Sequence, residues 1–535
     1  MGLSAAIQKQ RLGRAFRPNA YHAKVKTVPA SVWGWDQLNG LANMPPDHAI
    51  QLDNFIPRPG YLEIRRGYQE YATGIGSGAV ETIMSYNGPT KIERYATGND
   101  GTIYDITGGG AGIATTVTGL ASQRLQYTNF TGVDGAHYIF TANGVDAPRS
   151  YNGTTWASMG VTYSGGSQND IIQWNGFKGH LFGVKTQSTK FIYGTVGQIT
   201  GAFSVFDLGP LMTRGGYIVA CATWSIDSKQ TIDDYAIFIT SRGQCIVYQG
   251  TDPASADTWA LVSNFWIGPP IGQRCFLQIG GDLAVISIDG LLPISQMISA
   301  DRAAAGRTAF SVNIMNAMNM AARSYKNNFG WQLISYPRGQ LAIMNIPITE
   351  NDSSQQFVMN TLTGAWCRFT NINANCWEVS NDIAYFGGND GEVSQWDIGS
   401  GDGDSNVTAT VQTAFNYFGS RGVFKKFNTI RPIITSDGSV TPGVGINVDY
   451  GTGASVSVPA TVSTTGAQWD SGIWDQSTWG TEGGTTAYIT TISGIGTCAS
   501  VITTLATSNN GAADGVMLRI NAWDMTFEPA PGAGL

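Results

Sequence analysis

The sequence predicts an all-β chain: an extended N-terminal strap, then a β-propeller of six or seven blades, then an antiparallel β-sandwich. Three observations support this prediction. Glycine is abundant, at 68 of 535 residues, and glycine-rich turns are typical of proteins built from short strands. Aromatic residues make up 11% of the chain, which supplies apolar surface for a core and excludes disorder. Finally, a turn signal recurs at a nearly regular spacing.

Residues 1–71 are predicted to form a basic arm and an extended docking strap. The arm, from Met1 to Lys26, contains no acidic residue but carries Lys9, Arg11, Arg14, Arg17, Lys24 and Lys26. Such a segment becomes ordered when an acidic neighbouring protein or a nucleic acid binds it. We therefore expect Arg11, Arg14 and Arg17 to contact a partner. The strap that follows is rich in proline, which favours an extended path over a helix.

Residues 72–400 carry the repeat that predicts the propeller. Residues 95–106 read YATGNDGTIYDI and residues 385–398 read YFGGNDGEVSQWDI, so that each is a strand, a turn and a second strand. A blade of four short strands takes up roughly 40–50 residues. Turn centres recur at intervals close to that length, at Gly101, Gly144, Ser188, Gly243, Gly290, Gly339 and Gly391. The alternative is an array of β-sandwiches whose turns are spaced by accident.

Residues 401–535 are predicted to form the antiparallel β-sandwich. The polar junction GSGDGDSN precedes it, and the following strand candidates show no blade-like period. A basic cluster lies near the start of this domain and consists of Arg421, Lys425, Lys426 and Arg431. It is interpreted either as a polar docking contact for a partner subunit or as a solvated strand face.

The charge balance favours assembly. Only 13% of the residues are charged and the net charge is −7, or −13 without the six basic residues of the arm. So few charges suit a chain that buries surface against partners, and an acidic body argues against wrapping around nucleic acid. The six cysteines contain no C-x-x-C pair, which fits synthesis in a reducing compartment. No run approaches about 18 apolar residues, so no stable membrane insertion is predicted.

No catalytic, cofactor or metal site is predicted, and the chain is not expected to be an enzyme. The four histidines (His22, His48, His137 and His180) form no metal-binding motif. The sequence GIGSGA at 74–79 matches the dinucleotide pattern G-x-G-x-x-A, but no amphipathic helix follows it. Asp402, Asp404 and the two Asn-Asp-Gly turns complete no calcium loop, and calcium binding in these acidic loops is left open.

A glycan-binding or glycan-cleaving propeller, such as a spike or a sialidase-like enzyme, is the alternative function. Residues 150–156, SYNGTTW, are similar to the Asp-box of sialidase-type blades, although Gly153 comes one position early. Tryptophans that can stack on sugar rings recur at Trp469, Trp474 and Trp479. Tryptophan in a β-sandwich more often belongs to the core.

Three segments resemble the tail nozzle proteins of short-tailed phages, also called tail tubular protein B. They read GLANMPPDHAIQLDNFIPRPGYLEIRRGY (40–68), YFGGNDGEVSQWDIG (385–399) and TAFNYFGSRGVFKKFNTIRP (413–432). The resemblance implies a homohexameric ring below the tail adaptor ring, made in the host cytoplasm and located in the virion. It also implies that the ring docks tail fibre proteins and holds the genome gate closed before ejection. Viral double-stranded DNA would then pass through the channel without sequence-specific binding. The family has no catalytic residues to carry over.

Overall fold

The computed structural model describes residues 23–227, 232–298, 307–437, 440–451, 484–507 and 516–534. The regular secondary structure of these residues consists almost entirely of strands, which confirms the all-β prediction. The α-helices among them are short: α2 (Ile294–Met297) and α4 (Met315–Tyr325). None of the described helices is long and apolar enough to cross a membrane.

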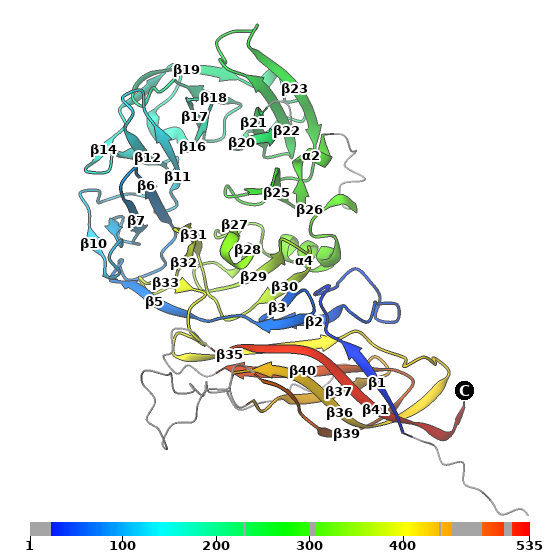
Figure 1. The fold of residues 1–535 in the computed structure, drawn as a ribbon. Helices are drawn as coiled ribbons and strands as arrows, with labels where there is room; N and C mark the ends of the chain where they lie inside the picture. The colour runs from blue at the N-terminus through cyan, green and yellow to red at the C-terminus, as the bar shows by residue number, and fades with distance from the viewer. Residues whose placement is uncertain are drawn as a thin grey trace, which may run out of the picture.

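Five separate sheets stand around a common centre and form blades of the predicted propeller (Figure 1). In chain order they are β10-β8-β7-β6, β11-β12-β13-β14, β15-β19-β18-β17-β16, β20-β21-β22-β23 and β24-β25-β26. Their strands are β6 (Ile83–Asn87), β7 (Ile92–Thr97), β8 (Ile103–Asp105), β10 (Ile113–Ala114), β11 (Gln126–Thr131), β12 (His137–Ala142), β13 (Arg149–Tyr151), β14 (Trp156–Ser158), β15 (Val161–Tyr163), β16 (Ile171–Phe177), β17 (His180–Lys185), β18 (Lys190–Tyr193), β19 (Gly201–Asp207), β20 (Ile218–Asp227), β21 (Ile232–Thr240), β22 (Gln244–Gly250), β23 (Trp259–Trp266), β24 (Phe276–Ile279), β25 (Asp282–Ser287) and β26 (Gly290–Pro293).

A series of 11 hydrogen-bonded strands occupies the rest of the circle, and some of these strands lie outside the circle. Its order is β27-β28-β29-β30-β2-β35-β34-β5-β33-β32-β31, and it is nearly closed because β27 contacts β31. Strand β31 also contacts β6 of the first sheet, which completes the circle. The strands are β27 (Gln332–Tyr336), β28 (Leu341–Thr349), β29 (Ser353–Asn360), β30 (Trp366–Phe369), β2 (Ala49–Asp53), β35 (Ser405–Thr413), β34 (Gly401–Asp402), β5 (Tyr68–Thr73), β33 (Val393–Trp396), β32 (Ile383–Gly387) and β31 (Cys376–Ser380).

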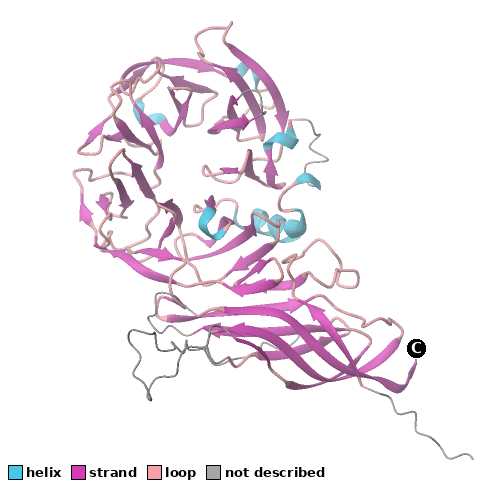
Figure 2. Ribbon diagram, in the orientation of Figure 1, coloured by secondary structure: helices cyan, strands magenta, loops and turns pink. Residues whose placement is uncertain are grey.

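The C-terminal strands form two layers beneath the propeller (Figure 2). One layer has the order β3-β4-β41-β36-β38, with β1 paired to β41 and β39 paired to β36; in the other, β40 joins β35 to β37. The strands not yet introduced are β1 (Lys24–Pro29), β3 (Phe55–Arg58), β4 (Tyr61–Ile64), β36 (Val423–Ser436), β37 (Gly443–Val448), β38 (Gly484–Ala487), β39 (Thr490–Gly496), β40 (Ala499–Thr507) and β41 (Leu518–Gly534). Apolar side chains of both layers, such as Ile434 and Leu505, belong to one buried cluster.

The strap supplies strands to both bodies. Strand β1 pairs with β41 and β4 pairs with the same strand, whereas β2 lies between β30 and β35. Strand β5 pairs with β33, so that Tyr68 faces Trp396 at the other end of the propeller sequence. The strap is therefore extended, as its prolines predict. Its strands pair with strands from the C-terminal half of the chain.

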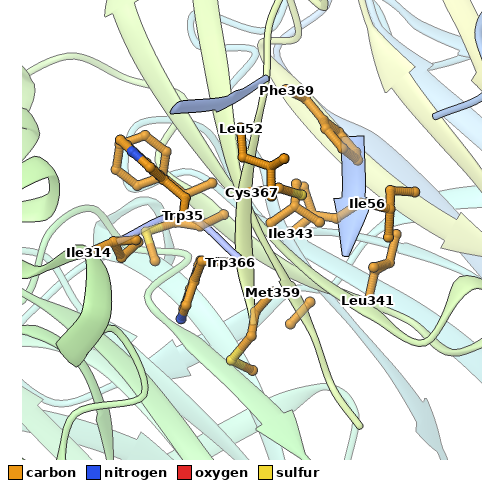
Figure 3. Close-up of a cluster of buried hydrophobic side chains, with 14 of the residues drawn as sticks. Trp35, Leu52, Ile56, Ile314, Leu341, Ile343, Met359, Trp366, Cys367 and Phe369 are labelled. Atoms are coloured by element: carbon orange, nitrogen blue, oxygen red, sulfur yellow. The ribbon is translucent and has the colours of Figure 1, made fainter. Parts of the chain in front are cut away.

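Strap side chains also pack into the propeller core (Figure 3). Trp35, Leu52 and Ile56 lie among apolar residues of β28 to β30, including Trp366 and Phe369, and all are buried. The Trp35 backbone N–H donates to the carbonyl of Trp366 at 2.7 Å. Because burying a large apolar side chain contributes about 1.5–3 kcal/mol, these contacts hold the strap strongly against the propeller.

The predicted hairpin turns use positive φ, as short turns require. Gly101 and Gly391 have φ of 78° and 71°. In two turns the left-handed residue is a glutamine: Gln187 (φ 46°) beside Ser188, and Gln340 (φ 56°) beside Gly339. The turn predicted near Gly339 is present, and Gln340 takes the left-handed conformation there instead of the glycine.

Gly67 lies where the strap meets the junction, and its replacement tests how closely these backbones pack. A Cβ at this position would lie 1.8 Å from the carbonyl oxygen of Gly401. Because the oxygen belongs to the backbone and a Cβ is held rigidly by its own backbone, neither atom can move without displacing a strand. We expect Gly67→Ala to destabilise the protein by about 3 kcal/mol or more, measured by thermal unfolding.

Gly108→Ala is the matched control, since a Cβ there meets nothing within 4 Å. It should change stability by no more than about 0.5 kcal/mol. Equal melting temperatures for the two variants would contradict the close approach at Gly67.

Candidate functional site

The structure places the predicted docking residues in different settings. Arg11, Arg14 and Arg17 lie outside the described residues. Lys425, Lys426 and Arg431 lie on β36, and Arg421 lies in the loop before it. Arg421, Lys426 and Arg431 are exposed whereas Lys425 is buried, so the four residues do not form one exposed patch.

Lys425 points into the protein. Its side chain is buried and its ammonium donates to the carbonyl oxygens of Ser420 (2.6 Å), Val423 (2.9 Å) and Thr497 (2.8 Å). Burial lowers the pKa of this ammonium. Three carbonyl acceptors use its three N–H donors, so that Lys425 ties β36 to the loops around it. The sequence carried a signal for this, because Lys425 shares its strand face with the buried Phe427.

The other three cations are more exposed. Arg431 donates to Asp524 at 2.5 Å and lowers the pKa of that carboxyl, which also accepts from the Thr27 hydroxyl. The Arg421 guanidinium lies 4.4 Å from the centre of the Tyr417 ring and donates to the carbonyl of Ala42 at 3.2 Å. Lys426 is exposed. Arg421 and Lys426 are thus the part of the predicted cluster best placed to meet a partner.

The acidic loop residues lie in different settings. Asp402 is buried against Arg65, and Asp404 is exposed. In the turn at 389–391, the Asn389 amide donates to the carbonyl of Asp352 at 2.7 Å. Across the described part of the chain, no group of three His, Cys, Asp or Glu residues is arranged to hold a metal ion.

The residues that suggested glycan chemistry fall into two groups. Trp156, the last residue of the Asp-box-like segment, packs against Tyr95 and Tyr151 with ring centres 5.2 and 5.1 Å away. The Asn152 side chain accepts from the backbone N–H groups of Thr154 and Thr155, which is ordinary turn chemistry. Trp469, Trp474 and Trp479 lie outside the described residues.

A buried ion pair joins the strap to the junction, and sequence reasoning missed it. Arg65 donates to both carboxylate oxygens of Asp402, at 2.7 and 2.6 Å, although 337 positions separate the two residues. Its Nε donates to the Asn54 side chain at 2.8 Å, and its Nη2 donates to the carbonyl of Thr370 at 2.9 Å. Burial raises the pKa of Asp402, whereas Arg65 acts to lower it. We call this arrangement the joint.

The second missed arrangement lies at the centre of the propeller. Arg274 precedes β24, and its guanidinium donates to the carbonyls of Glu81 (3.1 Å) and Leu125 (3.0 Å), in the segments leading to β6 and β11. It also donates to the Thr82 hydroxyl (2.9 Å) and to the Gln332 side chain (3.3 Å). Figure 1 shows β25, the partner of β24, across the circle from β6 and β11. Arg274 therefore spans the propeller axis.

Amide side chains connect neighbouring blades around this axis. The Gln173 side chain of β16 both donates to and accepts from the backbone of Cys221 on β20, at 3.1 and 2.9 Å. The Gln332 side chain of β27 makes the same pair of bonds to Trp377 on β31, at 2.7 and 3.0 Å. Each amide satisfies backbone groups that a strand edge would otherwise leave open.

Glu378 of β31 is the one acidic residue among those that line the axial cavity. This cavity has a volume of about 420 Å³, and its polar lining includes Gln126, Tyr127, Arg274 and Glu378. Burial raises the pKa of Glu378 to about 7, while Tyr127, Ser85 and Arg274 act in the opposite direction. The Glu378 carboxyl and the Arg274 guanidinium come from distant parts of the chain, and no local sequence motif indicates that they meet.

Comparison with known proteins identifies no family. No protein-family model matches the chain, and no curated protein matches it.

Parts of the chain are similar to solved structures. The extracellular domain of the hybrid two component system BT3049 from B. thetaiotaomicron has a TM-score of 0.37 and 11% identity, over 60% of this chain and 39% of that chain. YCF48 from Cyanidioschyzon merolae has a TM-score of 0.37 and 10% identity, over 62% of this chain and 98% of that one. BBS1N, in its complex with ARL6DN, has a TM-score of 0.28 and 13% identity, over 45% of this chain and 75% of that one. The chain thus spans about two fifths of the length of the first of these proteins.

Breaking the joint should destabilise the whole protein. Asp402→Asn removes the charge that compensates Arg65, and an unpaired buried charge costs about 3–5 kcal/mol. We expect a corresponding drop in stability in thermal or urea unfolding. Asp404→Asn is the control two positions away, and because Asp404 is exposed it should change stability by no more than about 0.5 kcal/mol. A joint variant as stable as this control would show that the ion pair is dispensable.

Glu378 should make stability depend on pH. Its pKa is raised to about 7 in the folded protein from an ordinary value of 4.5, so the folded state holds a proton that the unfolded state releases. Stability should therefore fall as pH rises from about 4.5 to about 7, by roughly 3 kcal/mol in total. Glu378→Gln carries no such proton and should melt at a higher temperature than the wild type at about pH 8, but not at about pH 5.

Glu70→Gln, at an exposed position, is the control for the Glu378 experiment. Its melting temperature should follow that of the wild type at every pH. A Glu378→Gln variant that does the same would mean that the carboxyl titrates normally.

Proposed function

We propose that this chain is a structural virion protein, the subunit of a tail nozzle ring of a short-tailed phage. The observation that carries the proposal is where the three resembling segments lie. Although residues 40–68, 385–399 and 413–432 are far apart in the sequence, the first of them contacts both of the others. Resembling segments that contact one another are better explained by a shared fold than by unrelated turn motifs.

Direct contacts connect the three segments. Strand β5, which begins at the end of the first segment, pairs with β33 of the second. Strand β2 of the first segment pairs with β35, whose last residue, Thr413, begins the third. Arg421 of the third segment donates to the carbonyl of Ala42 in the first. The resembling residues therefore form the region where the propeller and the C-terminal layers are joined.

The finer architecture is part of the proposal. We assign β27–β30 and β31–β33 with β5 as the sixth and seventh blades, because they complete the circle of five separate sheets. The two C-terminal layers are assigned as the β-sandwich. The domain division is residues 1–71, 72–400 and 401–535, with β5 crossing the first boundary to close the propeller.

The DNA channel is proposed to lie between subunits of a homohexamer. Arg274 crosses the propeller axis with hydrogen bonds to two distant blades, so the axis of a single propeller offers no passage for a DNA duplex. A net charge of −13 outside the basic arm suits a channel wall, because like charge keeps the phosphate backbone from binding during passage.

The remaining surfaces are assigned to assembly and not to catalysis. Arg11, Arg14 and Arg17 of the basic arm, with Arg421 and Lys426, are proposed to dock acidic surfaces of the tail adaptor ring or of tail fibre proteins. In this role the ring holds the genome gate closed before ejection, and the protein is located in the virion without membrane insertion. No substrate or cofactor is invoked.

Immunogold electron microscopy tests the proposal. Antibody raised against the recombinant chain is applied to phage particles from the source culture, and antibody absorbed with the same chain is the control. Gold at the tip of short tails, lost on absorption, is the expected result. Unlabelled intact tails, with an antibody that recognises the chain on a blot of the same particles, would overturn the nozzle assignment.

A further inference from the structure

A second pocket lies beside the axial cavity, and three cations contribute to its wall. These are Arg124, Arg274 and Lys326, and none of the described residues that line the pocket is acidic. Arg274 lines the axial cavity as well, so the two hollows are neighbours. The second pocket has a volume of about 290 Å³, close to the lower limit of small-molecule sites at about 300 Å³. It therefore suits a small ligand better than a peptide segment, and we call it the basic pocket.

The guanidinium groups of Arg124 and Arg274 lie close to each other. The Arg124 guanidinium is 4.3 Å from the centre of the Phe329 ring, and that of Arg274 is 5.3 Å from the same centre. Glu81 contacts both groups: its carboxylate accepts from Arg124 at 2.9 Å, and its backbone carbonyl accepts from Arg274 at 3.1 Å. Like charges in such an arrangement repel each other, and anions beside them relieve that repulsion.

The ion pairs beside the basic pocket all involve Arg124. Glu81 and Glu350 pair with its guanidinium at 2.9 and 2.5 Å. By contrast, Arg274 and Lys326 form no ion pair with any described residue, and Lys326 is exposed at the end of α4. The excess positive charge of the pocket therefore comes from Arg274 and Lys326.

Arg274 also keeps hydrogen-bond capacity. Of the five N–H donors of a guanidinium, those that reach described acceptors come from Nη1 and Nη2. Its Nε has no described acceptor but stays open to solvent, unlike the unpartnered Nε atoms of Arg94 and Arg149, which solvent does not reach. Burial lowers the pKa of the Arg274 guanidinium, and the nearby Glu378, with a pKa of about 7, is only partly charged at neutral pH. An anion beside Arg274 would therefore stabilise its charge and use its free donors.

We propose that the basic pocket binds a small oxyanion with two negative charges, such as phosphate or the phosphate group of a phosphomonoester. Arg274 and Lys326 supply the two opposing charges, and Arg274 donates to the oxyanion through N–H groups that have no described protein acceptor. The exposed amide of Asn327 is a further donor on the wall. This site belongs to the single subunit and does not depend on the proposed tail role.

Isothermal titration calorimetry on the full chain tests the charge preference. Inorganic phosphate, adenosine monophosphate and acetate are titrated at about pH 7 and at constant ionic strength. We expect phosphate or the monophosphate to bind at least tenfold more tightly than acetate, which carries a single charge. Tighter binding of the monophosphate would assign the site to a phosphomonoester, and otherwise it is assigned to the free ion. Binding of neither phosphate compound, or equally tight binding of acetate, would overturn the proposal.

Two variants locate the binding. Gln273 and Lys326 are exposed on the wall of the basic pocket, so Gln273→Glu and Lys326→Gln should leave the fold intact. Each makes the pocket less positive by one charge and should weaken binding of the tighter phosphate compound at least tenfold. Gln278→Glu and Arg323→Gln are the matched controls, because they change the charge equally at exposed positions outside the pocket. They should change the Kd by no more than about twofold.

The melting temperature gives a second readout of the same site. A ligand that binds only the folded state raises the melting temperature, so phosphate should stabilise the wild type and both controls more than it stabilises Gln273→Glu and Lys326→Gln. An equal rise in all of these proteins, together with equal affinities, would place the anion elsewhere and refute the proposal. A control that weakens binding as much as its pocket variant would refute it too, because the effect would then be one of net charge alone.

Discussion

The structure depends on the buried ion pair between Arg65 and Asp402. Removing two charges from water is unfavourable unless each is fully paired, and here the guanidinium reaches both carboxylate oxygens, the Asn54 side chain and the Thr370 carbonyl. Strap, propeller and junction can satisfy these bonds only in one relative position. The pair therefore fixes how the strap sits, and the strap in turn supplies β2 and β5 to the long strand path.

A second polar network organises the propeller from the inside. Apolar packing between blades is tolerant of small rotations, whereas the paired amide bonds of Gln173 and Gln332 fix the spacing of neighbouring inner strands. Arg274 adds a connection across the ring. The axis therefore carries polar side chains that connect separate blades, and the axial cavity lies among them.

The sequence predicts those features of the fold that a short stretch of neighbouring residues determines. Turns such as the one at Gly101 indicated the propeller, because a hairpin is encoded within a short stretch of sequence. The burial of Lys425 could also be predicted, since strand alternation places its side chain on the same face as that of Phe427. The partnership of Arg65 with Asp402 and the meeting of Arg274 with Glu378 could not be predicted, because nothing near each residue in the sequence indicates its distant partner. The pairing of β5 with β33 was hidden for the same reason.

That last pairing has a consequence for biosynthesis. Strand β5 leaves the ribosome early, but its partner, Val393–Trp396, is made only after all five separate sheets. Strand β1 (Lys24–Pro29) pairs with residues Ala522–Phe527 of β41, which are synthesised later still. A nascent chain must therefore carry its first strands unpaired through most of translation, with exposed edges that invite aggregation. The fold is therefore completed only once nearly the whole chain has been synthesised.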